Sequence, residues 1–151
     1  MHPGELAWSR PLGVAILTVL FGCAGGESGD GEACLDGLDL SCAPLYVATS
    51  FDDVFESTLI PSCSVGNSAC HAPAGGKGGL TFDVDDPDAA WTALREPVDA
   101  EPRVVPGDPA CSSLIQRLHS AETGFQMPPG MLLSEPERCA VTLWVLDGAQ
   151  R

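Results

Sequence analysis

The chain is poor in positive charge. Its 151 residues include only seven lysines and arginines against 21 aspartates and glutamates, which gives a formal net charge of −14. Nucleic-acid binding depends on basic side chains that neutralise phosphates, and no basic segment is present here. The composition therefore argues against a nucleic-acid partner and favours a well-solvated surface that attracts cationic partners.

Long apolar runs are scarce as well, and the clearest one lies near the N-terminus. Residues 11–22 are mostly apolar and follow Arg10, as in a signal peptide. As a helix this run would cover roughly 18 Å, too little for the ~30 Å core of a bilayer. The segment Leu20-Phe21-Gly22-Cys23 resembles a lipobox, so we expect export, cleavage before Cys23 and a lipid on that cysteine. An ordinary secretory signal with an incidental cysteine is the alternative.

These features divide the chain into a signal peptide (1–22), a flexible tether with an irregular lead-in (23–49) and one domain (50–151). The tether opens with a Gly-rich acidic run that cannot bury apolar surface. The rest is long enough for one domain and too short for two sizeable cores. We expect the domain to lie in the cell envelope, on the periplasmic side. Ala24 after the lipidated cysteine weakly favours sorting to the outer membrane.

Cysteine is comparatively abundant, with seven in the chain. This number fits an oxidising compartment and agrees with the export signal. If Cys23 carries a lipid, six cysteines remain, and six cysteines allow fifteen full pairings, so spacing alone does not give the connectivity. The six are Cys34, Cys42, Cys63, Cys70, Cys111 and Cys139. A Cys34–Cys42 bridge would close the irregular lead-in.

Four helices are expected, over about 51–60, 87–96, 109–120 and 134–148. Their N-terminal signals are Ser50, Asp86, Asp108 and Ser134, each a residue whose side chain caps helices. Prolines at the first helical position strengthen the second and third predictions, and Pro61 is expected to end the first helix. The domain is therefore predicted to be all-α, with long Gly- and Pro-rich loops.

The pair Cys70-His71 carries the chemical signal of the chain. Cysteine followed by histidine, with a second cysteine three positions before the first, is the Cys-x-x-Cys-His motif that attaches c-type haem. Here the upstream partner is Cys63, so six residues intervene instead of two. Two thioethers require both sulfurs on one side of the ring, so the four extra residues would have to bulge out as a loop, which Gly66, Asn67 and Ser68 suit.

Further motifs follow in a fixed order along the chain. A Phe-led helix, the Cys…Cys-His segment, Gly-Gly-Leu at 78–80, Val-Pro-Gly-Asp at 105–108, Met-Pro-Pro-Gly at 127–130 and a final helix with Trp144 occur in that sequence. Over residues 50–150 this resembles the small cytochrome c-like domains of envelope lipoproteins from planctomycetes and myxobacteria.

The resemblance implies a small class I cytochrome c-like fold and one covalent haem c on Cys63 and Cys70. His71 would be the proximal iron ligand and Met127 the distal one, a pair that suits electron transfer and leaves no open position for a substrate. The protein would then be an electron carrier for redox partners in the envelope, with no catalytic residues of its own. In the resembling family the third and last helices pack around the haem edge, which implies a Cys111–Cys139 disulfide.

Several assignments have alternatives. His119 and Met131 are the other candidates for the distal ligand, ranked after Met127 in that order. Apart from the histidine context, Met127 could simply fill an apolar gap, and His119 could complement a helix dipole. Trp144 and Phe55 are expected to be core residues.

Two other functions remain open from the sequence. The chain could be a haem-free lipoprotein domain stapled by a Cys63–Cys70 disulfide, with a binding or structural role. A Cu(I) site built from Cys63, Cys70 and His71, with Met127 as a further ligand, is the third possibility, since soft sulfur ligands select that ion.

Overall fold

The computed structural model describes residues 34–65, 70–98 and 101–151. The helical elements are α1 (Phe51–Val54), η1 (Phe55–Ser64), η3 (Lys77–Gly79), α2 (Pro87–Arg95), α3 (Ser113–His119) and α4 (Glu135–Leu146). Two-residue strands β1 (Pro97–Val98) and β2 (Glu101–Pro102) pair antiparallel, with Pro97 opposite Pro102. The all-α prediction is confirmed. The boundary predicted at Cys23 and the signal peptide lie outside the described residues.

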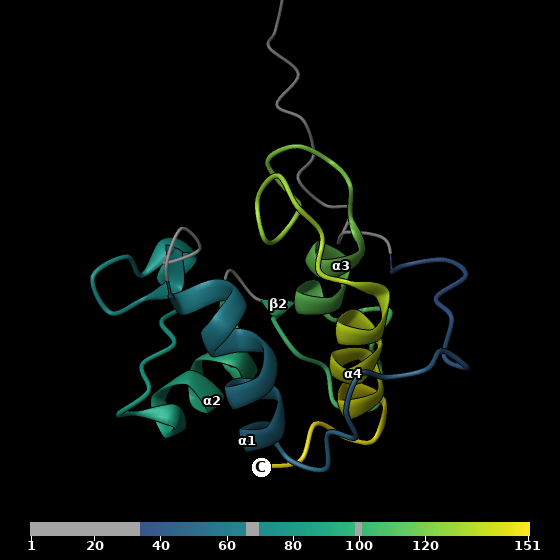
Figure 1. The fold of residues 1–151 in the computed structure, drawn as a ribbon, viewed down its shortest axis with the longest axis horizontal. Helices are drawn as coiled ribbons and strands as arrows, with labels where there is room; N and C mark the ends of the chain where they lie inside the picture. Colours follow the sequence, from purple (N-terminus) through teal and green to yellow (C-terminus); the bar gives the residue numbers. More distant parts are fainter. Residues whose placement is uncertain (1–33, 66–69, 99–100) are drawn as a thin grey trace, which may run out of the picture. The chain divides into compact units, whose positions relative to one another are not determined.

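Helices α1, α3 and α4 provide the main packing of the domain. α3 packs on α4, and α1 contacts α4 from another direction (Figure 1). α1 runs directly into η1, so the first helical segment extends from Phe51 to Ser64. Within the described ranges, no helix combines the length and apolar character needed to cross a bilayer.

The first helix starts where the sequence predicts but does not end there. The Ser50 hydroxyl accepts a hydrogen bond from the Asp53 N–H, and the Asp53 carboxylate accepts one from the Ser50 N–H, which is a capping box. The helix then widens into the π-helix η1, which continues through Pro61 to Ser64. The prediction that Pro61 ends the helix is therefore wrong, and the extension brings Cys63 onto a helical segment.

Helices α2 and α4 match their predictions. The Asp86 carboxylate accepts a hydrogen bond from the Ala89 N–H at 3.0 Å, and Pro87 occupies the first turn of α2. Ser134 and Glu137 form a capping box at the start of α4. These local signals sufficed because each cap satisfies backbone N–H groups that have no partner within the helix.

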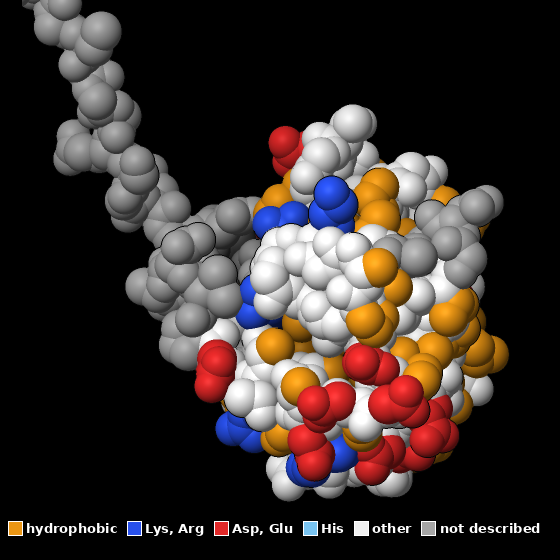
Figure 2. Space-filling view, turned by 90° about the vertical axis from the view of Figure 1, so that its left-hand side faces the viewer, with side chains coloured by type: hydrophobic (Ala, Val, Ile, Leu, Met, Phe, Trp, Pro, Cys, Tyr) orange, Lys and Arg blue, Asp and Glu red, His pale blue; other side chains and the backbone are white. Residues whose placement is uncertain are grey.

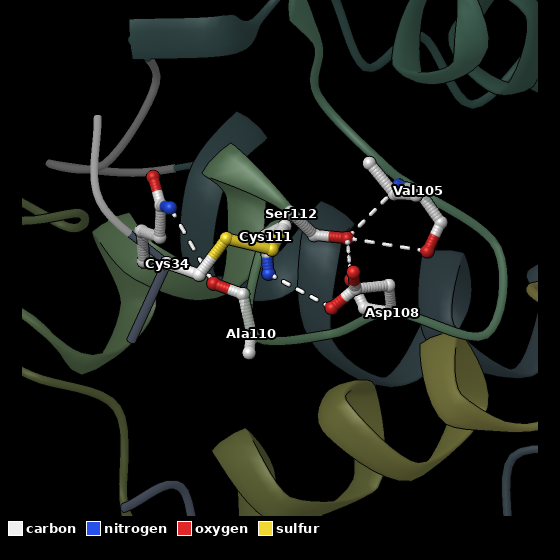
Figure 3. The surroundings of a disulfide bond; sticks show 7 residues. Cys34, Val105, Asp108, Ala110, Cys111 and Ser112 are labelled. Carbon is white, nitrogen blue, oxygen red and sulfur yellow. Dashed lines mark hydrogen bonds between the residues drawn. A yellow bond between two sulfur atoms is a disulfide. The ribbon is translucent and has the colours of Figure 1, made fainter. Parts of the chain in front are cut away.

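Helix α3 begins later than predicted. Asp108 caps a turn instead of the helix, because its carboxylate accepts a hydrogen bond from the Cys111 N–H at 3.1 Å. The Ser112 hydroxyl accepts from the Val105 N–H and donates to the Asp108 carbonyl, each at 2.8 Å (Figure 3). These bonds hold residues 105–112 in a compact turn, and α3 starts only at Ser113.

Aromatic side chains form the centre of the core. The Phe51 ring lies 5.2 Å from that of Phe55, 5.4 Å from Trp91 and 6.0 Å from Trp144, measured between centroids. Phe51, Phe55 and Trp144 are all buried, and the Trp144 indole N–H donates to the Gln150 carbonyl at 3.0 Å. The prediction that Phe55 and Trp144 are core residues is confirmed.

The disulfides differ from the predicted pairs. Cys34 is bonded to Cys111, and Cys42 is bonded to Cys139. The predicted Cys111–Cys139 and Cys34–Cys42 bridges are therefore wrong, although all four cysteines are disulfide-bonded. The reason is the path of the lead-in: Cys34 meets the turn before α3 (Figure 3), and Cys42 meets Cys139 on α4.

Backbone hydrogen bonds support the same path. The Leu35 N–H donates to the Ala110 carbonyl at 3.0 Å, and the Leu45 N–H donates to the Pro136 carbonyl at 2.9 Å. Residues 34–49, predicted as part of a tether and irregular lead-in, are thus irregular but fastened to the domain at two points.

Candidate functional site

A cavity of about 570 Å³ lies between η1, α2, α3 and the loops that connect them. Its size falls within the range of roughly 300–1,000 Å³ that small-molecule and cofactor sites occupy. The lining residues are Leu59, Cys63, His71, Lys77, Gly78, Leu80, Phe82, Leu94, Arg103, Ser113, Leu114, Arg117, Leu118, Phe125 and Met127.

The walls of this cavity are largely apolar. Leu59, Leu94 and Leu118 come from three different helices and are almost fully buried, and Phe82 is only 2% exposed. Phe82 also packs edge-on to Phe55, with 6.3 Å between ring centroids, which continues the wall into the core. Such a lining suits a ligand with a large apolar surface.

His71 is held in one orientation inside the cavity. Its Nδ1 lies 3.1 Å from the Leu80 carbonyl oxygen, which accepts hydrogen bonds and cannot donate them, so Nδ1 carries the proton. The Phe82 N–H donates to the His71 carbonyl at 2.6 Å, and the two rings lie 5.4 Å apart. The Nε2 lone pair remains for a ligand, as is usual for a histidine whose other nitrogen bonds a backbone carbonyl.

The two cysteines of the predicted attachment motif are free thiols. Cys63, on η1, lines the cavity, and Cys70 is half-buried next to His71 in the chain without lining it. Burial and the neighbouring Cys70 raise the pKa of the Cys63 thiol to about 11. The Cys63–Cys70 disulfide of the haem-free alternative is not formed. The segment 66–69 between them, predicted as a bulging loop, lies outside the described residues.

Met127 lines the same cavity as His71. It belongs to the loop after α3, and its N–H donates to the Arg117 carbonyl at 2.9 Å, which ties the loop to that helix. The chain thus brings together Cys63, His71 and Met127 from three separate segments.

The two other candidates for the distal ligand lie elsewhere. His119 lines a separate cavity of about 300 Å³, where its Nε2 lies 3.2 Å from the Thr142 hydroxyl. Burial, with a smaller contribution from Arg138, lowers the pKa of His119. Met131 is 74% exposed and is not part of the cavity lining. Neither side chain reaches the cavity that contains His71.

Three cations line the His71 cavity, and this feature was missed in the sequence. Lys77, Arg103 and Arg117 belong to the lining, whereas no aspartate or glutamate does. Arg103 and Arg117 make hydrogen bonds to backbone carbonyls, and the Arg117 guanidinium lies 4.4 Å from the centroid of the Phe125 ring. The chain has only seven lysines and arginines, and this scarcity was the one sequence feature that could have drawn attention to Lys77, Arg103 and Arg117.

The cluster of cysteine and histidine side chains that the Cu(I) hypothesis needs is not found in the described residues. Within these ranges, no group of three or more histidine, cysteine, aspartate or glutamate side chains lies close enough to hold an ion. The Cu(I) site suggested by Cys63, Cys70 and His71 is therefore not supported by the arrangement of these residues.

The apolar cavity of this all-α domain contains an oriented histidine and a methionine thioether, two side chains that can hold haem iron. Residues 68–130 match the family model described as Planctomycete cytochrome C. The match covers less than half of the chain and includes His71, Arg103, Arg117 and Met127, but it begins after Cys63. Nothing matches among curated proteins or among solved structures. The match supports the cytochrome c-like domain that the resemblance predicts, and it does not include the upstream half of the lengthened attachment motif.

Proposed function

We propose that this protein is a lipid-anchored electron carrier of the bacterial envelope that holds one covalent haem c. The observation that carries the proposal is the orientation of His71. Its Nδ1 proton is fixed by the Leu80 carbonyl, which leaves Nε2 as a ligand in an apolar cavity that also contains Cys63 and the Met127 thioether. The family match over residues 68–130 supports the same assignment.

The residues present fit this cofactor. Apolar walls suit the porphyrin face, and a fixed imidazole with a thioether suits iron. Haem supplies one-electron redox chemistry when bound. His71 and Met127 would hold the iron, and this ligand pair would favour electron transfer over catalysis.

Covalent attachment is proposed through Cys63 and Cys70. Their thiols would supply the two thioether bonds that hold haem c, each S–H adding across a vinyl double bond so that no leaving group is needed. Cys63 is supported by its place in the cavity wall, and Cys70 by its position next to His71.

The proposed cellular location is supported by the sequence and by the disulfides. The two bonds Cys34–Cys111 and Cys42–Cys139 fit an oxidising compartment such as the periplasm. A lipid on Cys23 would anchor the domain to the membrane, with outer-membrane sorting favoured by Ala24. The partners are redox proteins of the envelope that exchange one electron at a time.

The test uses the full chain co-expressed with a cytochrome c maturation system. We expect reduced-state visible bands of haem c and a mass increase of one haem that survives denaturation. His71→Ala should abolish stable haem incorporation, whereas the matched control His119→Ala should leave the spectrum unchanged because His119 lines a different cavity. A wild-type protein without haem would contradict the proposal and favour a haem-free lipoprotein domain held by the two observed disulfides.

The distal ligand has its own test. Met127→Ala should leave haem attached but remove the weak red absorption of a methionine–ferric bond and lower the reduction potential. Met131→Ala serves as the control, since Met131 is exposed and outside the cavity. An unchanged red band in Met127→Ala would rule out this methionine as the ligand.

A further inference from the structure

We propose that Arg103 and Arg117 bind the two carboxylates of the porphyrin and thereby fix which edge of the ring faces them. The inference rests on the proposed haem site. It goes beyond the iron ligands, because it says which residues would bind the carboxylate edge of the porphyrin. Neither Arg103 nor Arg117 belongs to the segment Cys63–His71 that would attach the haem.

The charge distribution is the first observation. Three of the chain's seven lysines and arginines line one cavity, in a protein whose formal net charge is −14. No carboxylate lines that cavity, and in the described residues both salt bridges are made by Arg151, outside it. Figure 2 shows Asp and Glu side chains gathered on the lower part of one face of the domain, with Lys and Arg side chains more scattered. The cavity cations therefore lack an acidic partner from the chain.

Arg103 is held rigidly in place. One guanidinium nitrogen donates to the Ala93 carbonyl and the other to the Gly78 carbonyl, both at 2.7 Å. Its backbone is fixed as well, because the Leu114 N–H donates to the Arg103 carbonyl at 2.9 Å. A guanidinium has five N–H donors, so these two bonds leave donors for a carboxylate at little further cost in side-chain entropy.

Arg117 is positioned by a second set of contacts. Its Nη1 donates to the Phe125 carbonyl at 3.2 Å while the guanidinium stacks over the Phe125 ring. The two arginines also influence one another, since burial first and repulsion from Arg117 second lower the pKa of Arg103. An anion placed near both guanidinium groups would relieve this repulsion.

The ligand that fits these features has a broad apolar body and a dianionic edge. Porphyrin carries two carboxylates on one edge, so the apolar walls and the arginine pair together match its chemistry. Charge-assisted hydrogen bonds from arginine to carboxylate are among the stronger ones in proteins and restrict geometry. The pair would therefore exclude the orientations that bury the carboxylates against Leu59 or Leu94.

The experiment compares ferric haem with its dimethyl ester, which lacks the two negative charges. The full chain made without the maturation system is titrated with each porphyrin, and binding is followed by the visible spectrum. We expect the wild type to prefer the free acid. Arg103→Gln and Arg117→Gln should each weaken binding of the acid by roughly 10- to 100-fold, as expected for the loss of a hydrogen bond to a charged group. Binding of the ester should change by less than about 3-fold, because the ester offers no carboxylate to lose.

Arg95→Gln is the matched control, because it removes the same charge from a side chain that stacks over Trp91 outside the cavity. Equal losses for acid and ester in Arg103→Gln would show that the arginine only clamps the backbone and would overturn the inference. So would a wild type that binds both porphyrins equally, although the haem assignment would then stand. A wild type that binds neither would overturn both proposals.

The covalently loaded protein gives a second readout. Loss of a cation beside the ring should lower the reduction potential in Arg103→Gln more than in Arg95→Gln, because the reduced cofactor carries one more negative charge. Equal shifts in the two variants would contradict a local role for Arg103.

Discussion

The pairing of the four disulfide-bonded cysteines gives the sharpest quantitative prediction. The observed bonds join residues 77 and 97 positions apart in the chain. In the chain-entropy account of cross-links, loops of these lengths stabilise the native state by about 4.5 and 4.7 kcal/mol. The pairs Cys34–Cys42 and Cys111–Cys139 would close loops of about 8 and 28 residues and contribute only about 2.5 and 3.6 kcal/mol.

Two double variants distinguish these pairings, because the two pairings predict opposite orders for the losses in free energy of unfolding. Cys34→Ala with Cys111→Ala removes one observed bond and should cost about 4.5 kcal/mol. Cys34→Ala with Cys42→Ala breaks both observed bonds and should cost about 9 kcal/mol, comparable with the entire stability of a typical domain. Under the short-loop pairing the order reverses, at about 6 and 2.5 kcal/mol.

The assay is guanidinium unfolding of the cofactor-free full chain, followed by far-ultraviolet circular dichroism. Thiols released by each variant are blocked with iodoacetamide so that Cys111 and Cys139 do not form a new bond. Peptide mapping of the wild type without reductant should recover Cys34 with Cys111 and Cys42 with Cys139. If the Cys34→Ala, Cys42→Ala variant were more stable than the Cys34→Ala, Cys111→Ala variant, the observed pairing and the path of the lead-in would both be refuted.

Two further predictions concern Cys63 and Cys23. Because burial raises the pKa of Cys63 from 9.0 to about 11, its contribution to stability is complete below pH 9 and is lost as pH rises towards 11. The cofactor-free domain should therefore lose on the order of 2 kcal/mol over that window, and Cys63→Ser should remove this part of the pH dependence in denaturant titrations. Cys23→Ala should release the exported protein from membranes, and a variant that still sediments with them after a carbonate wash would contradict the lipid anchor.

The sequence correctly predicted the helix ends that depend only on neighbouring residues. α2 starts at Asp86 with Pro87 and α4 at Ser134 with Glu137, because a cap acts within one turn of its own helix. The same reasoning gave a wrong end for the first helix at Pro61 and a wrong start for α3 at Asp108. The helical segment continues past Pro61 as a π-helix, and Asp108 bonds into a turn that is held from Val105 and Ser112.

The sequence predicted only those residues of the candidate site that belong to short, recognisable motifs. Cys70-His71 is adjacent in the chain, and the Met127 loop resembles a known motif, so both could be named before the structure. Arg103 and Arg117 could not, because fourteen positions separate them and only the tertiary structure places both in the lining of one cavity.

The sequence by itself determined the all-α class and the aromatic core residues Phe55 and Trp144, and it named His71 and Met127 as candidate site residues, since these depend on periodicity, caps and short motifs. Tertiary structure alone decided the disulfide partners, the exclusion of His119 from the His71 cavity and the place of Arg103 and Arg117 in its lining. The physical reason is the same in each case: these relations join residues far apart in the chain, and their distances depend on how whole helices pack and on the path of the lead-in across them.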